Sequence, residues 1–249
     1  MDHMDVWSDA GEREAGRRRG LAARTARLQV RQLRRAESRV SAEADLVTAA
    51  GWGDHLVLRE RGIDAHWLAT PLPDDEFRVC RARRDGGMKA GLLGNFQYAP
   101  NRDAYRLLVD SWLPWLRSIG CDVVVAGLGS DGLGVPPHGV EIIGRVADVN
   151  EFYSRITVTL APVRLGGGIK VKVLESLARG IPVVGSQFSF DGFPPSIFSM
   201  VRACADDGSD LARVLEGPLP NVDPDSPDLD QYRMSRVSAH IAKLLTEFV

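Results

Sequence analysis

The stretch Arg164-Leu-Gly-Gly-Gly-Ile-Lys-Val-Lys-Val-Leu-Glu-Ser-Leu-Ala-Arg-Gly-Ile-Pro-Val-Val-Gly-Ser186 decides the fold of this chain. The residues before it, 157–163, are mostly β-branched or small and apolar and lack helical spacing, which predicts a buried strand. Three glycines then open the backbone into a helix that we expect from about Lys170. Gly180 ends that helix before a second buried strand. The pattern predicts a strand-helix-strand unit.

The glycine turn at 166–168 has the chemistry of an anion site. Free N–H groups at a helix N-terminus carry partial positive charge, and glycines remove the side chains that would keep a phosphate away. Lys170 and Lys172 add full charges there, in a chain with 27 arginines and only four lysines. Glu175, in the second helical turn, offers a carboxylate to sugar hydroxyls. The alternative is an ordinary glycine turn before an amphipathic helix with solvated lysines.

The segment resembles the donor-binding signature of family 4 glycosyltransferases, enzymes of the GT-B class with two Rossmann-like domains. The resemblance extends over residues 88–192. Residues 90–96 with Pro100-Asn101 are similar to the first strand and loop of the family's donor domain. Residues 142–146 are similar to the segment that binds the base through its backbone. The first seventy residues resemble the end of the N-terminal domain more loosely.

The resemblance implies a role for each matched residue. Lys172 and Lys170 would be the catalytic groups, because they neutralise the diphosphate as negative charge develops on it. Many family members carry two glutamates flanking seven residues. Here the second is Glu175, which would hold the ribose, and the first position is Gly167, as in a Gly-Gly-x-x-x-Lys version of the pattern. The implied donor-binding residues are Gly94, Asn95, Arg145, Val146, Gly166, Gly167, Gly168, Ile169 and Glu175.

We therefore expect a hexosyltransferase-like glycosyltransferase of glycan biosynthesis that acts on a nucleotide-sugar, a UDP- or GDP-sugar, with retention at the sugar. The acceptor would be a glycan, a lipid or a small molecule. The resemblance implies no metal and no separate cofactor. Two alternatives stay open. One is a non-catalytic nucleotide-sugar-binding subunit. The other is a GT-B-fold nucleotide-sugar epimerase, which would carry carboxylates and histidine in the cleft.

The expected fold class is α/β, a Rossmann-like parallel sheet with helices on both faces and a helical N-terminal remnant. Strands are expected near residues 46–49, 66–69, 89–94, 122–127, 140–144, 157–162, 182–186 and 200–203. Helices are expected near residues 16–42, 102–117, 149–154, 170–179, 209–216 and 229–248.

Two domains are expected. Residues 1–75 would be the incomplete end of an N-terminal Rossmann-like domain, and residues 76–249 the donor-binding domain, with a polar linker at Arg78–Gly87. Because a complete enzyme of this class has both domains, we expect an internal start or a separate polypeptide that supplies the other half. By itself the chain is expected to bind a nucleotide-sugar and to transfer it negligibly.

Composition limits the function classes. A net charge of −2 gives no general attraction to nucleic acid. Three scattered cysteines without metal-ligand spacing indicate reduced thiols. The sequence has no signal-peptide core and no apolar stretch of the roughly 20 residues that span a bilayer. These features predict a cytoplasmic protein.

Charge is nevertheless uneven, because residues 12–39 contain ten arginines and three glutamates. This segment predicts a basic helix that packs against the rest of the protein through one narrow apolar stripe and is otherwise exposed to solvent. Peripheral contact with a membrane surface is the alternative. We favour the solvated helix, since the stripe is poor in the aromatic and leucine side chains that enter lipid. The expected stripe is Ala22, Ala26, Val30, Leu33 and Val40.

One motif is typical of a different function, dinucleotide binding. Residues 127–132, Gly-Leu-Gly-Ser-Asp-Gly, satisfy the dinucleotide-binding fingerprint and follow an expected strand. Such a site needs a helix that starts within the loop, so that its N-terminus meets the pyrophosphate. Gly134, Pro136 and Pro137 follow instead and prevent a helix. The sequence therefore disfavours a nicotinamide-dependent oxidoreductase.

Overall fold

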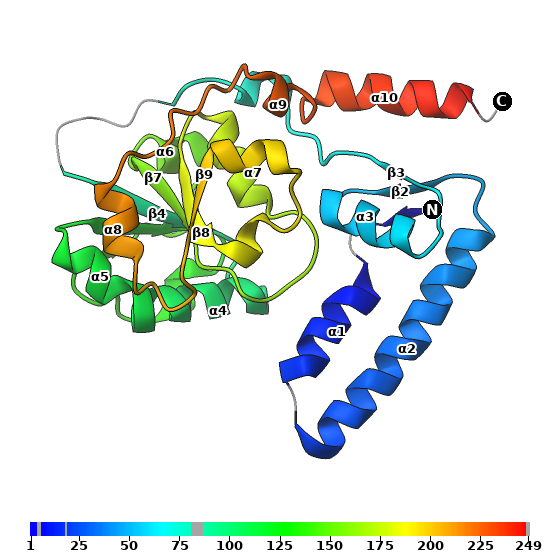
Figure 1. The fold of residues 1–249 in the computed structure, drawn as a ribbon. Coiled ribbons are helices and arrows are strands. Elements are labelled where there is room, and N and C mark those ends of the chain that lie inside the picture. The colour runs from blue at the N-terminus through cyan, green and yellow to red at the C-terminus, as the bar shows by residue number, and fades with distance from the viewer. Residues whose placement is uncertain (4–5, 18, 81–86, 248–249) are drawn as a thin grey trace.

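The structure of the protein, a computed structural model, describes residues 1–3, 6–17, 19–80 and 87–247. In this part of the chain, six parallel strands form one sheet in the order β6-β5-β4-β7-β8-β9. Figure 1 labels β4, β7, β8 and β9 of this sheet. The order reverses between β4 and β7, which makes this the topological switch point where open α/β sheets bind ligands. The strands are β4 (Lys89–Leu93), β5 (Asp122–Ala126), β6 (Val140–Ile142), β7 (Val158–Ala161), β8 (Val183–Ser186) and β9 (Val201–Cys204).

Helices cover both faces of this sheet, which confirms the predicted fold class. On one face, α4 (Ala99–Leu107), α5 (Leu113–Ser118) and α8 (Leu211–Glu216) bury their apolar side chains against β4, β5 and β7. A five-residue π-helical turn joins α4 to α5, so the predicted helix at 102–117 is continuous but begins earlier. On the other face lie α6 (Val149–Tyr153) and α7 (Val171–Ala178).

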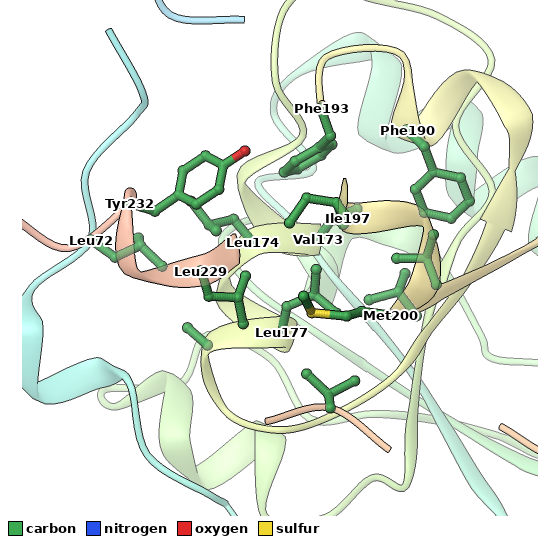
Figure 2. Packing of buried hydrophobic residues seen from close by; sticks show 14 of the residues in the cluster. Leu72, Val173, Leu174, Leu177, Phe190, Phe193, Ile197, Met200, Leu229 and Tyr232 are labelled. Carbon is green, nitrogen blue, oxygen red and sulfur yellow. The ribbon is translucent and has the colours of Figure 1, made fainter. Parts of the chain in front are cut away.

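The core around α7 joins distant parts of the chain. Figure 2 shows Leu72, Leu229 and Tyr232 gathered with Leu174 and Leu177 of this helix. These partners come from the segment between the two sheets and from α9 (Pro227–Asp230) with the residues after it. Burial of such side chains contributes about 1.5–3 kcal/mol each. Residues that lie before and after α7 in the sequence therefore pack against this helix, which follows the glycine turn.

The C-terminal part was predicted as one helix at 229–248, and this was wrong. The described residues form α9 and then α10 (Met234–Thr246), separated by a turn, and residue 248 lies outside the described residues. The turn forms because Leu72 pairs with this segment: its N–H donates to Tyr232 O at 2.8 Å, and Met234 N–H donates to Leu72 O at 2.9 Å. The predicted linker at 78–87 falls mainly on residues 81–86, which are outside the described residues.

The N-terminal part forms a second parallel sheet. Among the described residues it contains β1 (Asp2–His3), β2 (Val47–Ala49) and β3 (Ala65–Trp67), with α3 (Trp52–Glu60) between the last two strands. The sequence did not predict β1, which is only two residues long, or α3. The two sheets lie on either side of the expected boundary near residue 75, and the division into domains stays a prediction. Within the described residues no helix is long and apolar enough to cross a membrane.

The basic segment forms two helices rather than one. α1 (Trp7–Arg17) and α2 (Gly20–Ala42) pack side by side as a hairpin that extends from the rest of the fold (Figure 1). Gly20, with a φ of 63°, allows the reversal between them. The helix predicted at 16–42 corresponds to α2, which begins later, at Gly20, and ends where predicted, whereas α1 was not predicted as a separate helix.

The predicted apolar stripe of α2 was only partly correct. Ala26 and Val30 are buried, but Ala22, Leu33 and Val40 are exposed. The buried face continues through polar residues that apolar spacing cannot reveal. Glu37 accepts a hydrogen bond from Ser8 N–H at 3.0 Å, and Ser41 Oγ lies 3.0 Å from His3 Nε2. The exposed face carries Arg24, Arg27, Arg31 and Arg35, and the choice between a solvated helix and contact with a membrane surface stays a prediction.

Candidate functional site

A pocket of about 320 Å³ opens at the switch point of the large sheet. It lies where the chain leaves β4 and β7, between the start of α4 and the start of α7. Ligands of open α/β sheets bind at such carboxyl ends of strands. The lining residues are Leu93, Gly94, Asn95, Tyr98, Pro100, Asn101, Val163, Leu165, Gly166, Gly167, Ile169, Lys170, Val171, Lys172 and Glu175.

Most of the residues singled out from the sequence meet in this pocket. Three do not. Gly168 lines a smaller pocket of about 160 Å³ next to α1 and α3. Arg145 is exposed and Val146 packs beside α6, because both follow the edge strand β6, two strands away from β4. The predicted residues that line the larger pocket are Gly94, Asn95, Gly166, Gly167, Ile169, Lys170, Lys172 and Glu175.

The glycine turn is an irregular loop held at both ends. Gly166 and Gly168 have φ values of 108° and 55°, a region that glycine adopts without strain. Arg164 anchors the loop to α4 through two hydrogen bonds to the Asp103 carboxylate, at 2.8 and 2.9 Å. A loop fixed in this way can present backbone N–H groups to an anion without first paying the ordering entropy.

Lys170 holds the same loop in shape through hydrogen bonds to two loop carbonyls. It is the N-cap residue of α7, and its ammonium donates to Gly167 O at 3.1 Å and to Gly168 O at 2.6 Å. The ammonium also lies 4.6 Å from the centre of the Phe188 ring, a cation–π contact. Lys170 therefore lines both pockets and stabilises the shape of the loop between them.

Lys172 projects into the larger pocket from the first turn of α7. Its ammonium donates to Asn101 Oδ1 at 2.8 Å, and Asn101 Nδ2 in turn donates to Asn95 O at 2.9 Å. Gly94 leaves room for this amide, since a Cβ at that position would lie 3.0 Å from the Asn101 side chain. Burial lowers the pKa of Lys172 to about 8, and the negative charge of Glu175 opposes that shift.

Glu175 lies one helical turn after Lys172 on the same side of α7. The hydroxyl of Tyr153 donates to Glu175 Oε2 at 3.4 Å and to Lys172 O at the same distance. Burial raises the pKa of Glu175, and Arg179 is the main opposing influence. The pocket thus combines a cation, glycine backbone and a hydrogen-bond-accepting carboxylate, which suits a ligand with both phosphate and hydroxyl groups.

The loop at residues 127–132, which carries the dinucleotide fingerprint, has the structure that the sequence predicted. Residues after β5 form a short 3₁₀ turn, η3 (Ser130–Leu133), and no α-helix starts in the loop. Gly127 has a φ of 127°, and a Cβ there would lie only 2.0 Å from Gly94 O. The glycine is needed for the close packing of this loop against the loop after β4.

Sequence reasoning missed several lining residues. Asn101 was noticed only as part of a family resemblance, and Tyr98 and Leu165 had no role. Tyr153, which touches Glu175, was also missed, because nothing in its local spacing reveals a partner on α7. Among the described residues no group of three or more His, Cys, Asp or Glu side chains could hold a metal ion.

Comparison with known proteins agrees with this geometry. Residues 88–207, which contain the whole pocket lining, match the model of the family described as glycosyl transferases group 1. The fold is that of GT-B glycosyltransferases. No curated protein matches the sequence.

Three solved structures illustrate the likeness. Sucrose-phosphate synthase from Thermosynechococcus elongatus is 15% identical, with a TM-score of 0.65 over 99% of this chain and 66% of that one. HepE from Anabaena, in complex with UDP and glucose, is 12% identical, with a TM-score of 0.59 over 82% of this chain and 63% of that one. The lipopolysaccharide outer core galactosyltransferase WaaB is 16% identical, with a TM-score of 0.57 over 83% and 63%. The chain thus spans a little under two thirds of the length of HepE and WaaB.

Proposed function

We propose that this chain is a glycosyltransferase that binds a nucleotide-diphosphate sugar in the pocket at the start of α7. One observation carries the proposal: Lys172 and Glu175 project from one side of α7 into the pocket that the glycine loop lines. The group 1 glycosyltransferase model matches the same residues. A UDP-sugar is the first candidate donor, because HepE was crystallised with UDP-glucose, and a GDP-sugar is the second.

In this proposal, the diphosphate lies against the glycine loop and the ammonium of Lys172. Bond breaking between the sugar and the diphosphate leaves negative charge on the leaving group, and a preorganised cation stabilises that charge. Lys170 contributes by fixing the loop, since its ammonium already binds two loop carbonyls. Glu175 accepts hydrogen bonds from the ribose. The acceptor is a glycan, a lipid or a small molecule whose hydroxyl replaces the diphosphate, with retention at the sugar.

A non-catalytic nucleotide-sugar-binding protein is the second candidate. It is favoured by Gly167, which stands where many family 4 glycosyltransferases have a glutamate that contacts the transferred sugar. Without that side chain, the site could hold the nucleotide and lack a contact to the sugar. A nucleotide-sugar epimerase has less support, because the described lining of the pocket contains no histidine and only one carboxylate, that of Glu175.

Donor turnover separates these candidates. The full chain would be incubated with UDP-, GDP- and ADP-sugars and a mixture of glycan, lipid and small-molecule acceptors, and the released nucleoside diphosphate would be measured. Release that disappears in Lys172→Ala and persists in Lys243→Ala, an exposed lysine on α10, supports a transferase. Donor binding without release favours a binding protein for this chain by itself, and it is also the result expected from the sequence if a second domain must supply the acceptor site. A chain that neither binds nor turns over any donor contradicts both.

A further inference from the structure

Arg179 is a buried charged residue directly behind the proposed donor pocket. It is the C-cap residue of α7 and its relative exposure is 0%. Each guanidinium nitrogen has a partner at 2.9 Å: Nη2 donates to Glu76 Oε2, Nη1 to Glu175 O and Nε to Asn150 Oδ1. A buried charge is costly unless it is paired and hydrogen-bonded in this way. The arrangement is therefore specific for arginine.

Arg179 also acts on the Glu175 carboxylate indirectly, because both residues contact Tyr153. Its guanidinium lies 4.8 Å from the centre of the Tyr153 ring. The hydroxyl of the same ring donates to Glu175 Oε2. Arg179 thus fixes both the backbone carbonyl of Glu175 and the tyrosine against which the Glu175 carboxylate rests.

The third partner, Glu76, belongs to the segment that joins the two sheets. This residue ends the 3₁₀ turn η1 (Asp74–Glu76) and is half-buried. The backbone that follows runs along the end of α7, with Arg78 N–H donating to Ala178 O at 3.0 Å and Cys80 N–H donating to Arg179 O at 2.9 Å. Arg179 therefore connects the joining segment, through Glu76, with Glu175 in the donor pocket.

The charges around Glu175 act in opposite directions. Burial raises its pKa, Arg179 and Lys172 lower it, and Glu76 raises it; Tyr153 lowers it through its hydrogen bond. Loss of Arg179 would therefore favour the protonated carboxyl, and loss of Glu76 would favour the carboxylate. The carboxylate accepts hydrogen bonds from ribose hydroxyls through both oxygens and more strongly than the protonated carboxyl, which uses one oxygen as a donor.

We propose that Arg179 is a positioning residue for the ribose-binding carboxylate of Glu175, and that its ion pair with Glu76 makes donor binding depend on the segment between the two sheets. The proposal rests on the function proposed above. It differs from a purely structural role in one respect. A structural role predicts equal effects on all ligands of the pocket, whereas a positioning role affects only ligands that contain a ribose.

The test compares UDP with inorganic diphosphate, by calorimetry on the full chain between pH 5 and 8. Arg179→Met should weaken UDP binding at neutral pH by about 10-fold, the order of one hydrogen bond to a charged group. Inorganic diphosphate should bind unchanged. UDP affinity falls as pH drops through the pKa of Glu175, so this fall should begin at a higher pH in Arg179→Met and at a lower pH in Glu76→Gln.

Two further variants keep the test decisive. Glu141→Gln breaks a surface ion pair with Arg155, 2.8 Å in length. This variant should change neither the affinity for UDP or diphosphate nor the pH profile of UDP binding. If Arg179→Met alone fails to fold, the double variant Glu76→Gln/Arg179→Met removes both charges of the ion pair and should still lose UDP affinity selectively. Equal losses for UDP and diphosphate, or an unmoved pH profile in both Glu76→Gln and Arg179→Met, would overturn the positioning role. A wild-type chain that binds neither ligand would instead refute the proposed function.

Discussion

The ammonium of Lys172 is held by the side-chain amide of Asn101, 2.8 Å away and 71 residues earlier in the chain. The amide is neutral, so it orients the lysine without cancelling its charge. Asn101 is itself oriented by the carbonyl of Asn95, which lies just after β4. The two halves of the pocket wall, one after β4 and one at the start of α7, therefore come together around a cation that remains available to an anionic ligand.

Replacement of Lys172 by alanine should weaken binding of nucleoside diphosphates by roughly 10- to 150-fold. A hydrogen bond to a charged group contributes about 1.5–3 kcal/mol, which corresponds to this range. The measurement is calorimetric titration of UDP into the full chain. Lys243→Ala removes an exposed lysine from α10 and serves as the matched control, with affinity equal to wild type. Equal affinities for Lys172→Ala and wild type would remove the phosphate role of this residue.

Lys172 should also lower the stability of the folded chain at neutral pH. Burial lowers its pKa from the ordinary lysine value of 10.5 to about 8 on folding, so the unfolded state binds more protons between these values and stability rises with pH there. Lys172→Met should therefore have a higher Tm than wild type at pH 7, and the difference should shrink as the pH rises from 8 to about 10. A lower Tm for Lys172→Met at pH 7 would mean that the lysine supports the fold.

The same pKa predicts the pH dependence of ligand binding. A diphosphate binds best when the Lys172 ammonium is charged, so affinity of the wild-type chain should fall as the pH rises through about 8. In Lys172→Ala this fall should be absent. Titration of inorganic diphosphate at pH 7 and pH 9 measures the effect without a contribution from the nucleoside. An identical pH dependence in the two proteins would assign the titration to another group.

Replacement of Glu175 by alanine should separate the ligands by their ribose. If the carboxylate accepts ribose hydroxyls, UDP binding should weaken by about 10-fold or more. Binding of inorganic diphosphate should stay within twofold of wild type. Glu175→Gln retains the size and one acceptor, so it should show a smaller loss for UDP. Equal losses for both ligands would indicate damage to α7 and not a lost contact.

Gly127 and Gly132 offer a paired test of the fingerprint. Gly127→Ala places a Cβ 2.0 Å from Gly94 O in a residue with a φ of 127°. Such strain and overlap should cost at least about 1–3 kcal/mol of unfolding free energy. Gly132→Ala meets no atom within 4 Å, and its effect should be close to zero or slightly stabilising. Urea unfolding measures both. Similar values for the two variants would contradict the packing role of Gly127.

The large sheet was predictable because its signals are local. Most strands from residue 89 onward are short, largely apolar runs next to a glycine or proline, such as β5 before Gly127 and β8 after Pro182. The helix predicted at 170–179 has both a start and a stop signal. The N-terminal errors have physical causes. Apolar spacing cannot show that Glu37 and Ser41 complete a buried face through hydrogen bonds. A two-residue strand such as β1 has no periodicity to read.

The candidate site was predictable to the extent that it is contiguous. Residues 166–175 lie on one loop and one helix, so their convergence follows from the strand-helix-strand pattern. The contacts that orient these residues do not follow from that pattern. Asn101 reaches Lys172, and Arg179 reaches Glu76 across 103 residues, only because the folded chain brings these elements together. Arg145 and Val146 lie beside the edge strand, and the sequence alone did not show how far that edge is from the pocket.

The most direct test of the account is calorimetric titration of the full wild-type chain with UDP, GDP and ADP and their sugars, beside Lys172→Ala and Lys243→Ala. We expect at least one nucleoside diphosphate and its sugar to bind with a stoichiometry of one. This binding should be lost or strongly weakened in Lys172→Ala and unchanged in Lys243→Ala. A wild-type chain that binds none of these compounds, or binding that survives intact in Lys172→Ala, would contradict the assignment of this pocket to a nucleotide-sugar.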